Sequence, residues 1–254
     1  MHLNNFIDEL KIKKGDTLLI TGNTIKLLKK FKRTQKEFSL NHFIDKVIQK
    51  LGEEGTLIFQ TFNWGFCRNE PFDILNTRSQ TGAIGNIALK RDDFIRTKHP
   101  IYSFAVTGKY KNELANLHNI GAFDINSPFA FMHEKKASMI IIDLDLQNSF
   151  TFGHYVEELR NISYRYNKHF TSKYIDIDGH EEMKTYDMYV RDIEHNVQTS
   201  IHALEDLFVE QNAMITYNID GIQIRNIDLN TAFTIVDNDI IYNDAKNLYI
   251  IEDS

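Results

Sequence analysis

Apolar residues recur at helical spacing in the segment that follows Ser39. They fall at i, i+3, i+4, i+7, i+8 and i+11, on one face of a helix: Leu40, Phe43, Ile44, Val47, Ile48 and Leu51. Ser39 is a favourable N-cap and Gly52 a favourable stop. The pattern predicts an amphipathic helix over residues 40–51. A further helix is predicted over residues 24–31, where Asn23 or Thr24 can act as the cap.

Short apolar runs of strand type flank these helices. One covers residues 17–21, after the Gly15-Asp16 turn, and the next covers residues 56–59, after Gly55. The order strand, helix, strand predicts a right-handed crossover between parallel strands. A third apolar run at residues 139–142 is expected to be another strand.

Residues 60–138 differ from the rest, because they hold all three prolines of the chain and several glycines. We expect a loop-rich region with helices over residues 82–90 and 111–118. Ordered loops of this length in a compact domain are usually functional.

The last hundred residues predict antiparallel hairpins. Asp178-Gly179 separates alternating runs at residues 173–177 and 183–190, and Asp220-Gly221 separates runs at 214–219 and 222–227. Between these hairpins a helix is predicted from Ile193, Val197, Ile201, Leu204 and Phe208. We therefore expect one α/β domain over residues 1–254, with a mixed sheet of early parallel crossovers and C-terminal antiparallel hairpins. Its active-site loops would span about 60–138, and its hairpin-rich part about 170–254.

Composition narrows the class of protein. The net charge of −6 argues against nucleic acid or an anionic membrane as the main partner, and 42% hydrophobic residues suffice for a core. No apolar run reaches the length of a membrane span, and the start lacks the pattern of a signal peptide. Cys67 is the only cysteine, which fits a reducing compartment, so we expect a cytoplasmic protein. No Cys/His spacing predicts a metal site, and Asp-Gly hairpin edges leave a homodimer open.

The run that follows the third strand carries candidate chemistry. His154 and Glu157 are three residues apart where a helix could begin, so their side chains would share a face. A hydrogen bond from one imidazole nitrogen to Glu157 would fix the tautomer and leave the other nitrogen free as a base.

An ordered set of motifs resembles the aminoglycoside N(3)-acetyltransferase family, which has the antibiotic N-acetyltransferase fold and not the GNAT fold. The most specific string is Arg96-Thr97-x-His99-Pro100-x-x-Ser103-Phe104. The other landmarks, in chain order, are Gly15-Asp16, Gly52-x-x-Gly55-Thr56-Leu57 with Thr61-Phe62, Phe72-Asp73, Thr77-x-Ser79 with Gly82-Ala83, Ser127-Pro128, and Thr151-x-x-His154-x-x-Glu157.

The resemblance implies transfer of an acetyl group from acetyl-CoA, as cosubstrate, to a primary amine of an amino sugar. It implies His154 as general base and Glu157 as the residue that orients it. The coenzyme site that it implies comprises Gly22, Asn23, Thr24, Ile25, Lys26, Ser103 and Phe104, with the basic run to Arg33 nearby. Relatives typically have His-Ser-Ser-Leu where this chain has Thr21 to Ile25, so only Thr24 keeps a hydroxyl contact.

The acceptor loop also departs from the family pattern. Resistance enzymes have acids after Thr-Phe, whereas residues 63–69 contain an arginine and no acid. An arginine fork suits phosphate, which favours a nucleotide-linked amino deoxysugar as acceptor. The candidate acceptor contacts are Asn63, Trp64, Arg68, Asp73 and the segment 186–191, with Phe66 as a further stacking residue. The alternative is an aminoglycoside, for which the acids Asp176, Asp178, Glu181, Glu182 and Asp187 are available.

Three other interpretations stay open. Cys67 with His154 could form a thiol or serine hydrolase site, although an inert thiol is the simpler interpretation. The altered segment 21–25 could mark a non-catalytic relative that binds coenzyme or sugar. His99 could be catalytic, although a structural hydrogen bond to the backbone is the simpler role.

Overall fold

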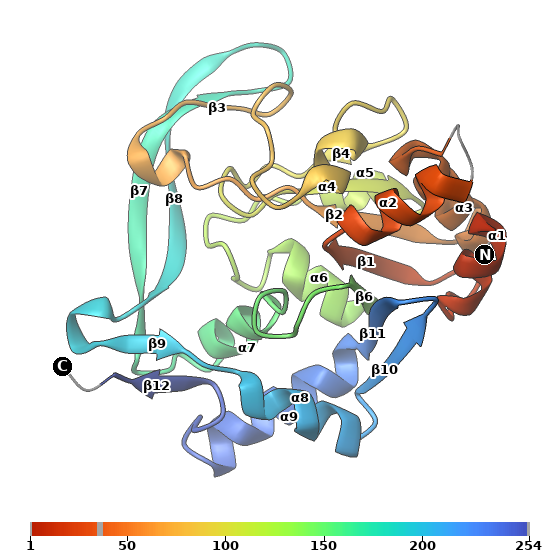
Figure 1. The fold of residues 1–254 in the computed structure, drawn as a ribbon. Coiled ribbons are helices and arrows are strands. Elements are labelled where there is room, and N and C mark those ends of the chain that lie inside the picture. The colour runs from red at the N-terminus through yellow and green to blue at the C-terminus, as the bar shows by residue number, and fades with distance from the viewer. Residues whose placement is uncertain (1, 35–37, 253–254) are drawn as a thin grey trace.

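The computed structural model describes residues 2–34 and 38–252, and Figure 1 shows the arrangement of the elements. The helices are α1 (Leu3–Glu9), α2 (Ile25–Thr34), α3 (Leu40–Leu51), α4 (Ala83–Ala88), α5 (Lys111–Ala115), α6 (Pro128–Glu134), α7 (Gly153–Leu159), α8 (His202–Glu210), α9 (Leu229–Tyr242) and the 3₁₀ turns η1 (Phe66–Arg68) and η2 (Ile193–His195). The strands are β1 (Thr17–Gly22), β2 (Thr56–Gln60), β3 (Phe72–Asp73), β4 (Ile95–Arg96), β5 (Phe104–Gly108), β6 (Ser138–Ile142), β7 (Arg165–Ile175), β8 (Glu181–Arg191), β9 (Val197–Thr199), β10 (Met214–Ile219), β11 (Ile222–Asp228) and β12 (Tyr249–Ile251).

The main sheet confirms the mixed topology predicted from sequence. Its strand order is β10-β11-β6-β1-β2-β5-β4, in which β1 pairs in parallel with β2 and β6. The Asp220-Gly221 hairpin joins β10 to β11, and β11 pairs antiparallel with β6. Both predicted hairpins are present, because β7 and β8 pair over eleven residues each.

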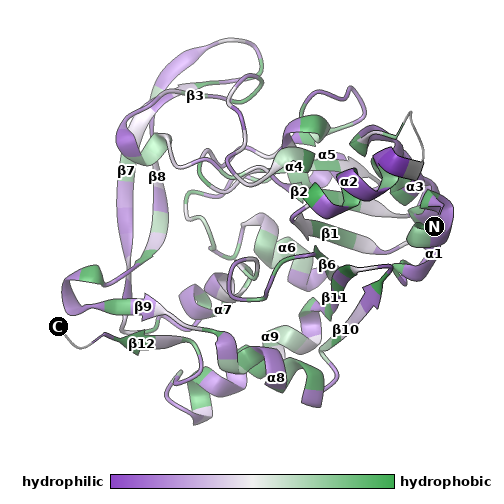
Figure 2. Cartoon of the chain, viewed as in Figure 1, coloured by the Kyte–Doolittle hydropathy of each residue, from purple (hydrophilic) through white to green (hydrophobic). Residues whose placement is uncertain are grey.

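The central strands are buried on both faces, which explains why they are continuous apolar runs. Alternate residues of β1 belong to different cores. Leu18 and Ile20 pack with helices α1 to α4, whereas Leu19 packs with α5 to α9. Figure 2 shows the apolar β1 and β6 at the centre of the molecule and a more polar β7–β8 hairpin at its side.

The predicted helix over residues 40–51 is confirmed, and Ser39 accepts a hydrogen bond from the backbone N–H of His42. The predicted helix over residues 193–208 is wrong in its first half. Residues 193–199 form η2 and β9, Asn196 has a left-handed backbone (φ 56°), and β9 pairs with β12. The apolar side chains at 193 and 197 therefore serve a turn and a strand, and the helix begins only at His202.

Two further boundaries differ from the prediction. The helix expected over residues 111–118 ends at Ala115, and the loop-rich middle also contains β5, which pairs with β2 inside the main sheet. The helix α9 was not predicted from the sequence.

The β7–β8 hairpin stands along one side of the molecule and is joined to the middle loops by the parallel pairing of β3 with β7. Among residues 2–34 and 38–252, every helix is too short or too polar to cross a membrane.

Candidate active site

His154 and Glu157 lie at the start of α7, directly after the loop that leaves β6. His154 Nδ1 is 2.6 Å from Glu157 Oε2, so the hydrogen bond predicted from the three-residue spacing is present. The histidine side chain is 22% exposed and the glutamate side chain only 3%. The imidazole is therefore held from the protein side by Nδ1, while its other edge reaches a cavity.

Glu157 is the centre of a buried polar network. Its Oε1 accepts a hydrogen bond from the Tyr164 hydroxyl at 2.8 Å, and its Oε2 lies 2.9 Å from Arg165 Nε. Burial alone would raise the pKa of Glu157, but His154 and Arg165, together with the hydrogen bonds, hold it below its usual value. The glutamate is thus ionised, accepts hydrogen bonds from His154 and Tyr164, and forms an ion pair with Arg165.

The pKa of His154 is lowered, first by burial and then by the charge of Arg165, which together outweigh Glu157. At neutral pH the ring is therefore neutral. Because Nδ1–H donates a hydrogen bond to the ionised Glu157, the free lone pair of the ring is on Nε2. A neutral imidazole with a free nitrogen can accept a proton from a bound substrate.

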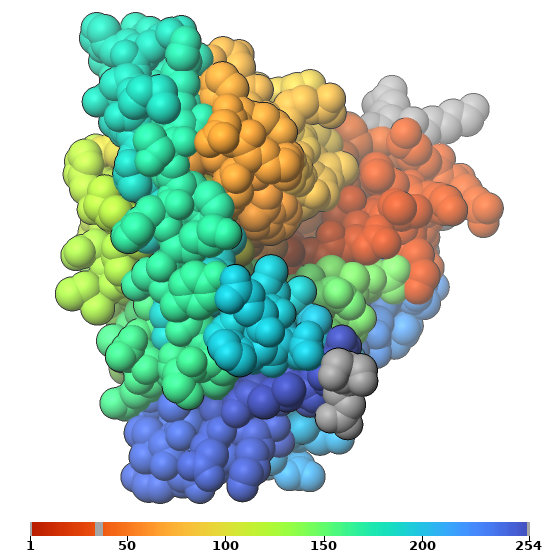
Figure 3. Space-filling view, turned by 90° about the vertical axis from the view of Figure 1, so that its left-hand side faces the viewer, coloured from red at the N-terminus to blue at the C-terminus, as the bar shows by residue number. Residues whose placement is uncertain are grey.

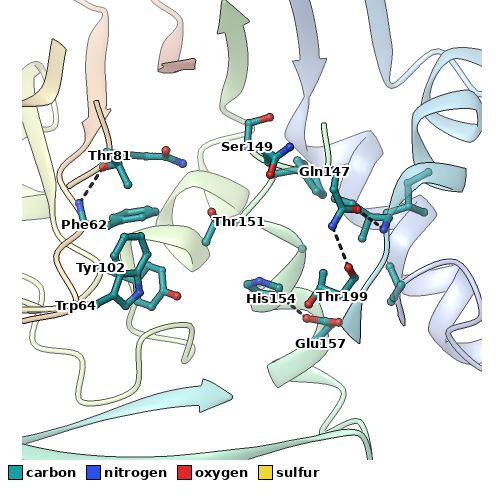
Figure 4. Close-up of a pocket in the computed structure, with 17 residues that line it drawn as sticks. Phe62, Trp64, Thr81, Tyr102, Gln147, Ser149, Thr151, His154, Glu157 and Thr199 are labelled. Atoms are coloured by element: carbon teal, nitrogen blue, oxygen red, sulfur yellow. Dashed lines mark hydrogen bonds and ion pairs between the residues drawn. The ribbon is translucent and has the colours of Figure 1, made fainter. Parts of the chain in front are cut away.

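Two cavities meet at His154. The first, which we call the inner cavity, measures about 320 Å³. It is lined by side chains from the end of β2, from the middle loops and from the loop before α7, among them Gln60, Trp64, Thr81, Tyr102, Gln147, Ser149, Thr151, His154 and Thr199. Figure 4 shows Phe62, Trp64 and Tyr102 on one side of this cavity and His154 with Glu157 on the other.

The second, which we call the hairpin cavity, measures about 400 Å³. Side chains of β7 and β8 form most of its wall, among them Arg165, Tyr166, Lys168, Phe170, Met188, Tyr189 and Arg191. His154, Tyr102 and Thr199 line both cavities. Figure 3 shows the adjoining surface, which is recessed between the orange loop near residue 65, the green loop before α7 and the cyan segment near residue 195.

Several residues of the inner cavity were missed from sequence. Gln60 is 6% exposed, and its Nε2 has no partner among the described residues, while its Oε1 accepts a hydrogen bond from Thr21. Gln147 links two segments, because it donates to the carbonyl of Thr199 and accepts from the backbone N–H of Ile201. These are single amides in loops or at strand ends, and no local spacing marks them as functional.

The motif from Arg96 to Phe104, the most specific string of the sequence, consists mainly of buried side chains that support the fold. Arg96 is 6% exposed and donates to the carbonyls of Thr77 and Thr61 and to Ser103 Oγ. Ser103 and Phe104 are fully buried. The prediction that these two side chains contact coenzyme therefore needs correction, because Ser103 is bound to Thr61 and Arg96 and Phe104 is in the core.

His99 belongs to the same string and has the structural role. Its Nδ1 accepts hydrogen bonds from the backbone N–H groups of Ile101 and Tyr102, and burial lowers its pKa to about 4. The neutral ring fixes the turn that places Tyr102 at both cavities.

The Arg96 network predicts a stability effect. Replacing Arg96 with methionine leaves the Thr61 and Thr77 carbonyls without this donor, so we expect a loss of about 2–4 kcal/mol in the free energy of unfolding. Thermal unfolding should show a decrease of roughly 5–15 °C in Tm. Arg68→Gln is the control, because Arg68 is 56% exposed. Equal Tm values for both variants would contradict the structural role.

The predicted coenzyme segment from Gly22 to Lys26 lies where β1 leads into α2. Gly22 has a φ of 121°, and a Cβ there would lie 2.1 Å from the Ile142 carbonyl, so glycine is required. Asn23 Oδ1 accepts from the backbone N–H of Ile25, and Lys26 Nζ is 2.6 Å from Asp143. Thr24 is buried, with 7% of its surface exposed.

This segment adjoins the inner cavity without lining it. Thr21 binds Gln60, which lines the cavity, and a Cβ on Gly82 would lie 3.9 Å from the Gly22 carbonyl. Lys30 in the basic run is paired with Asp220 at 2.6 Å. The segment thus sits behind the wall that Gln60 and Thr81 form.

The predicted acceptor residues separate into two groups. Trp64 lines the inner cavity, as expected for a ligand contact. Asn63 and Asp73 instead hold loop turns, because Asn63 binds Arg78 and Gly65, and the Asp73 carboxylate accepts from residues 75 and 76. Arg68 Nε is 3.0 Å from Glu70 Oε1 and lines neither cavity.

Two related expectations also changed. Phe66 is 2% exposed and packs on Tyr186, so it is a core residue and not a stacking platform. The segment 186–191 does reach the site, because residues 188–191 line the hairpin cavity. The acids at 176–182 lie toward the tip of the hairpin and line neither cavity at His154.

Cys67 has the properties of an inert thiol. Burial raises its pKa to about 11, and it lines neither cavity at His154. We expect Cys67→Ser to keep its turnover within about twofold, because a thiol in this state has little nucleophilic thiolate. Iodoacetamide treatment at neutral pH should likewise leave activity intact. Inactivation that Cys67→Ser prevents would instead support the hydrolase interpretation.

Among the described residues, one group has a spacing that could hold a metal ion, Asp176 with Asp178 and His180 at the hairpin tip. It lies away from His154 and is mostly exposed, and we assign it no role.

The comparisons with known proteins agree with this geometry. The family model for aminoglycoside 3-N-acetyltransferase matches residues 28–239. None of the curated protein sequences matches this chain. Among solved structures, AAC-VIa bound to sisomicin is 16% identical with a TM-score of 0.75, and covers 95% of this chain and 96% of that one.

Two other solved structures have the same fold. AAC-IIIb in a binary complex with CoASH is 13% identical with a TM-score of 0.75 and covers 94% of each chain. YokD from Bacillus subtilis is 18% identical with a TM-score of 0.72 and covers 94% of this chain and 97% of that one. The fold likeness spans almost the whole chain, and the family model covers most of it. This chain therefore belongs to the aminoglycoside 3-N-acetyltransferase family, a family of acyltransferases.

Proposed function

We propose that this protein transfers an acetyl group from acetyl-CoA to a primary amine of an amino-sugar compound, with His154 as general base. The observation that carries the proposal is a neutral histidine, fixed by a buried carboxylate, at the point where two cavities meet. Such a junction suits acyl transfer, because the acceptor amine must reach both the base and the thioester carbonyl at one point.

The reaction follows from the protonation state of the pair. The amine nitrogen attacks the thioester carbonyl, while Nε2 of His154 accepts a proton from that nitrogen. The imidazolium is stabilised by Glu157, and the tetrahedral intermediate then collapses as the C–S bond breaks. The proton on Nε2 passes to the departing sulfur, so coenzyme A leaves as a thiol and the ring is neutral again.

The inner cavity is the proposed site of the thioester arm. It lies at the carboxyl ends of β1, β2 and β6, the edge at which α/β sheets bind ligands. Its volume suits a narrow pantetheine chain, and the unpartnered Nε2 of Gln60 could donate to an amide or thioester carbonyl. The segment from Gly22 to Lys26, one layer behind, remains our candidate for the coenzyme phosphates. The solved structure of AAC-IIIb, which has this fold, is a binary complex with CoASH.

The hairpin cavity is the proposed acceptor site, and two acceptor classes are candidates. Membership of the family favours aminoglycosides, and AAC-VIa binds sisomicin. Amino sugars linked to a nucleotide are the second class, supported by the basic residues of this cavity. Arg68 no longer supports that class, because Glu70 already neutralises it.

The test is thiol release from acetyl-CoA with a panel of acceptors. It should contain aminoglycosides, free amino sugars, and nucleotide-linked 3-amino and 4-amino deoxysugars. We expect thiol release that depends on both acetyl-CoA and an amine, with an N-acetylated product detected by mass spectrometry. Calorimetric binding of coenzyme A without turnover of any amine would overturn the proposal in favour of a non-catalytic relative.

A further inference from the structure

The hairpin cavity is strongly basic. Three cationic side chains line it, Arg165, Lys168 and Arg191. Among the described residues that line this cavity there is no carboxylate, and Glu157, which pairs with Arg165, lies behind the wall. A cavity built for a compound with several ammonium groups would be expected to carry the opposite charge.

Internal pairing leaves two of these cations available. Arg165 is 5% exposed and is committed to Glu157, 2.9 Å away. Arg191 donates to the neutral side-chain oxygen of Gln198, so its charge is not compensated there. Lys168 Nζ lies 5.7 Å from the ring centroid of Phe170. Within the described ranges 2–34 and 38–252, neither Lys168 nor Arg191 forms an ion pair with a carboxylate.

The hairpin contributes side chains from both of its faces to the cavity. Lys168 is opposite Met188, and both line the cavity, as do Tyr166 and Val190 from the next pair on the same face. His169 and Asp187, one residue along each strand, form their own pair and belong to the other face. There Asp187 bridges to the loop at Gly121 and not to the cavity. Arg191 alternates with Lys168 and has the same parity as Asp187, but Arg191 lines the cavity with Arg165 and Tyr189, whereas Asp187 is paired with His169 and does not line it.

We propose that the hairpin cavity binds an anionic group of the acceptor, a phosphate or a carboxylate, through Lys168 and Arg191. This proposal rests on the proposed function, because it concerns the acceptor of the same reaction. Arg191 supplies a planar fork suited to two oxygens of the anion, and Lys168 supplies a second positive charge. The amine to be acetylated would then lie toward His154, which lines the same cavity.

The same cations could in principle serve the coenzyme, but the geometry favours the acceptor. The inner cavity reaches the Gln60 and Thr81 wall, behind which lies the segment from Gly22 to Lys26. Lys168 and Arg191 line the hairpin cavity and not the inner cavity, so His154 lies between them and the wall of Gln60 and Thr81. A coenzyme that binds along the inner cavity would therefore place its phosphates on the side of His154 that is remote from Lys168 and Arg191.

The experiment measures binding by calorimetry, so that it does not depend on turnover. The probes are glucosamine 6-phosphate, glucosamine, an amino sugar with a carboxylate, a nucleoside-diphosphate-linked 4-amino deoxysugar, and tobramycin. We expect the wild-type protein to bind the anionic probes more tightly than glucosamine or tobramycin. Lys168→Gln and Arg191→Gln should each weaken binding of the preferred anionic probe by about tenfold or more. Comparing phosphate with carboxylate identifies which anion the site prefers.

The control variant is Arg68→Gln, which removes a cation outside both cavities and should leave every affinity unchanged. Affinity for coenzyme A should also stay the same in Lys168→Gln. Three results would overturn the inference: tighter binding of tobramycin than of the anionic probes, equal affinities of wild type and both variants, or weakened coenzyme A binding in Lys168→Gln. If one of these three results were accompanied by thiol release with an amine that carries no anionic group, the proposed acetyl transfer would stand and only the anion-binding inference would fail.

Discussion

His154→Ala is expected to lower kcat by about 10²- to 10⁴-fold, the range typical of a lost general base. The loss should fall mainly on kcat, because the ring takes up a proton in the transition state while both cavities keep their other walls. Stopped-flow or steady-state thiol release with the best acceptor measures it. Coenzyme A affinity, measured separately, should change little.

The pH profile gives this variant a second measurement. Because burial and Arg165 lower the pKa of His154, the acid limb of kcat/KM that it causes should lie below the usual histidine value of 6.5. That limb should be absent from His154→Ala. The matched control is His195→Ala, because His195 pairs with Asp192 at the same three-residue spacing and 2.6 Å distance but is 78% exposed. Equal activity of wild type and His154→Ala would exclude His154 as the base.

Glu157→Gln is expected to damage both catalysis and stability. The change removes the negative charge between His154 and Arg165, so the imidazolium formed during transfer loses its counter-ion. We expect a loss of roughly 10²-fold in kcat, with the pKa of His154 lowered further. Arg165, 5% exposed, is left without its carboxylate, which should cost about 3–5 kcal/mol in the free energy of unfolding.

Glu158→Gln is the control on the adjacent residue, and its effect on stability should have the opposite sign. Burial, together with Asp124 and Asp187, raises the pKa of Glu158 from 4.5 to about 7. A carboxyl group with a raised pKa costs the folded state stability as pH rises from 4.5 through 7, because only the unfolded chain ionises it freely. At pH 8 the amide should therefore raise Tm, whereas Glu157→Gln lowers it. Equal shifts in the two variants would contradict the network described for Glu157.

The parts of the fold that were predicted correctly have strong local signals. The helix α3 has a serine cap, a glycine stop and an apolar stripe, and the strands β1, β2 and β6 are short apolar runs bounded by turns. The apolar residue at 197 failed as a helix signal because the partner of its strand, β12, lies more than fifty residues away. Strand pairing at that separation leaves no mark on the local period of either segment.

The site divides in the same way. The bond between His154 and Glu157 follows from a spacing of three residues on one helix, so the sequence determined it. The resemblance also identified Arg96, His99 and Ser103 as a motif. Only the structure revealed that their side chains are buried and support the Thr61 loop and the Tyr102 turn. A motif records which residues occur together, and it does not distinguish a buried scaffold from a binding surface.

By itself the sequence determined the mixed α/β class, the family and the pair at the start of α7, because each depends on neighbours within a few residues or on an ordered string of motifs. Tertiary structure decided which charges line the cavities at His154. Arg68, the arginine that the sequence favoured, is neutralised by Glu70, two residues away. Lys168 and Arg191 both line the hairpin cavity, although the register of β7 and β8 places them on opposite faces of the hairpin. Local spacing cannot encode that convergence, since it depends on the pairing of two strands and on the way their hairpin packs against α7.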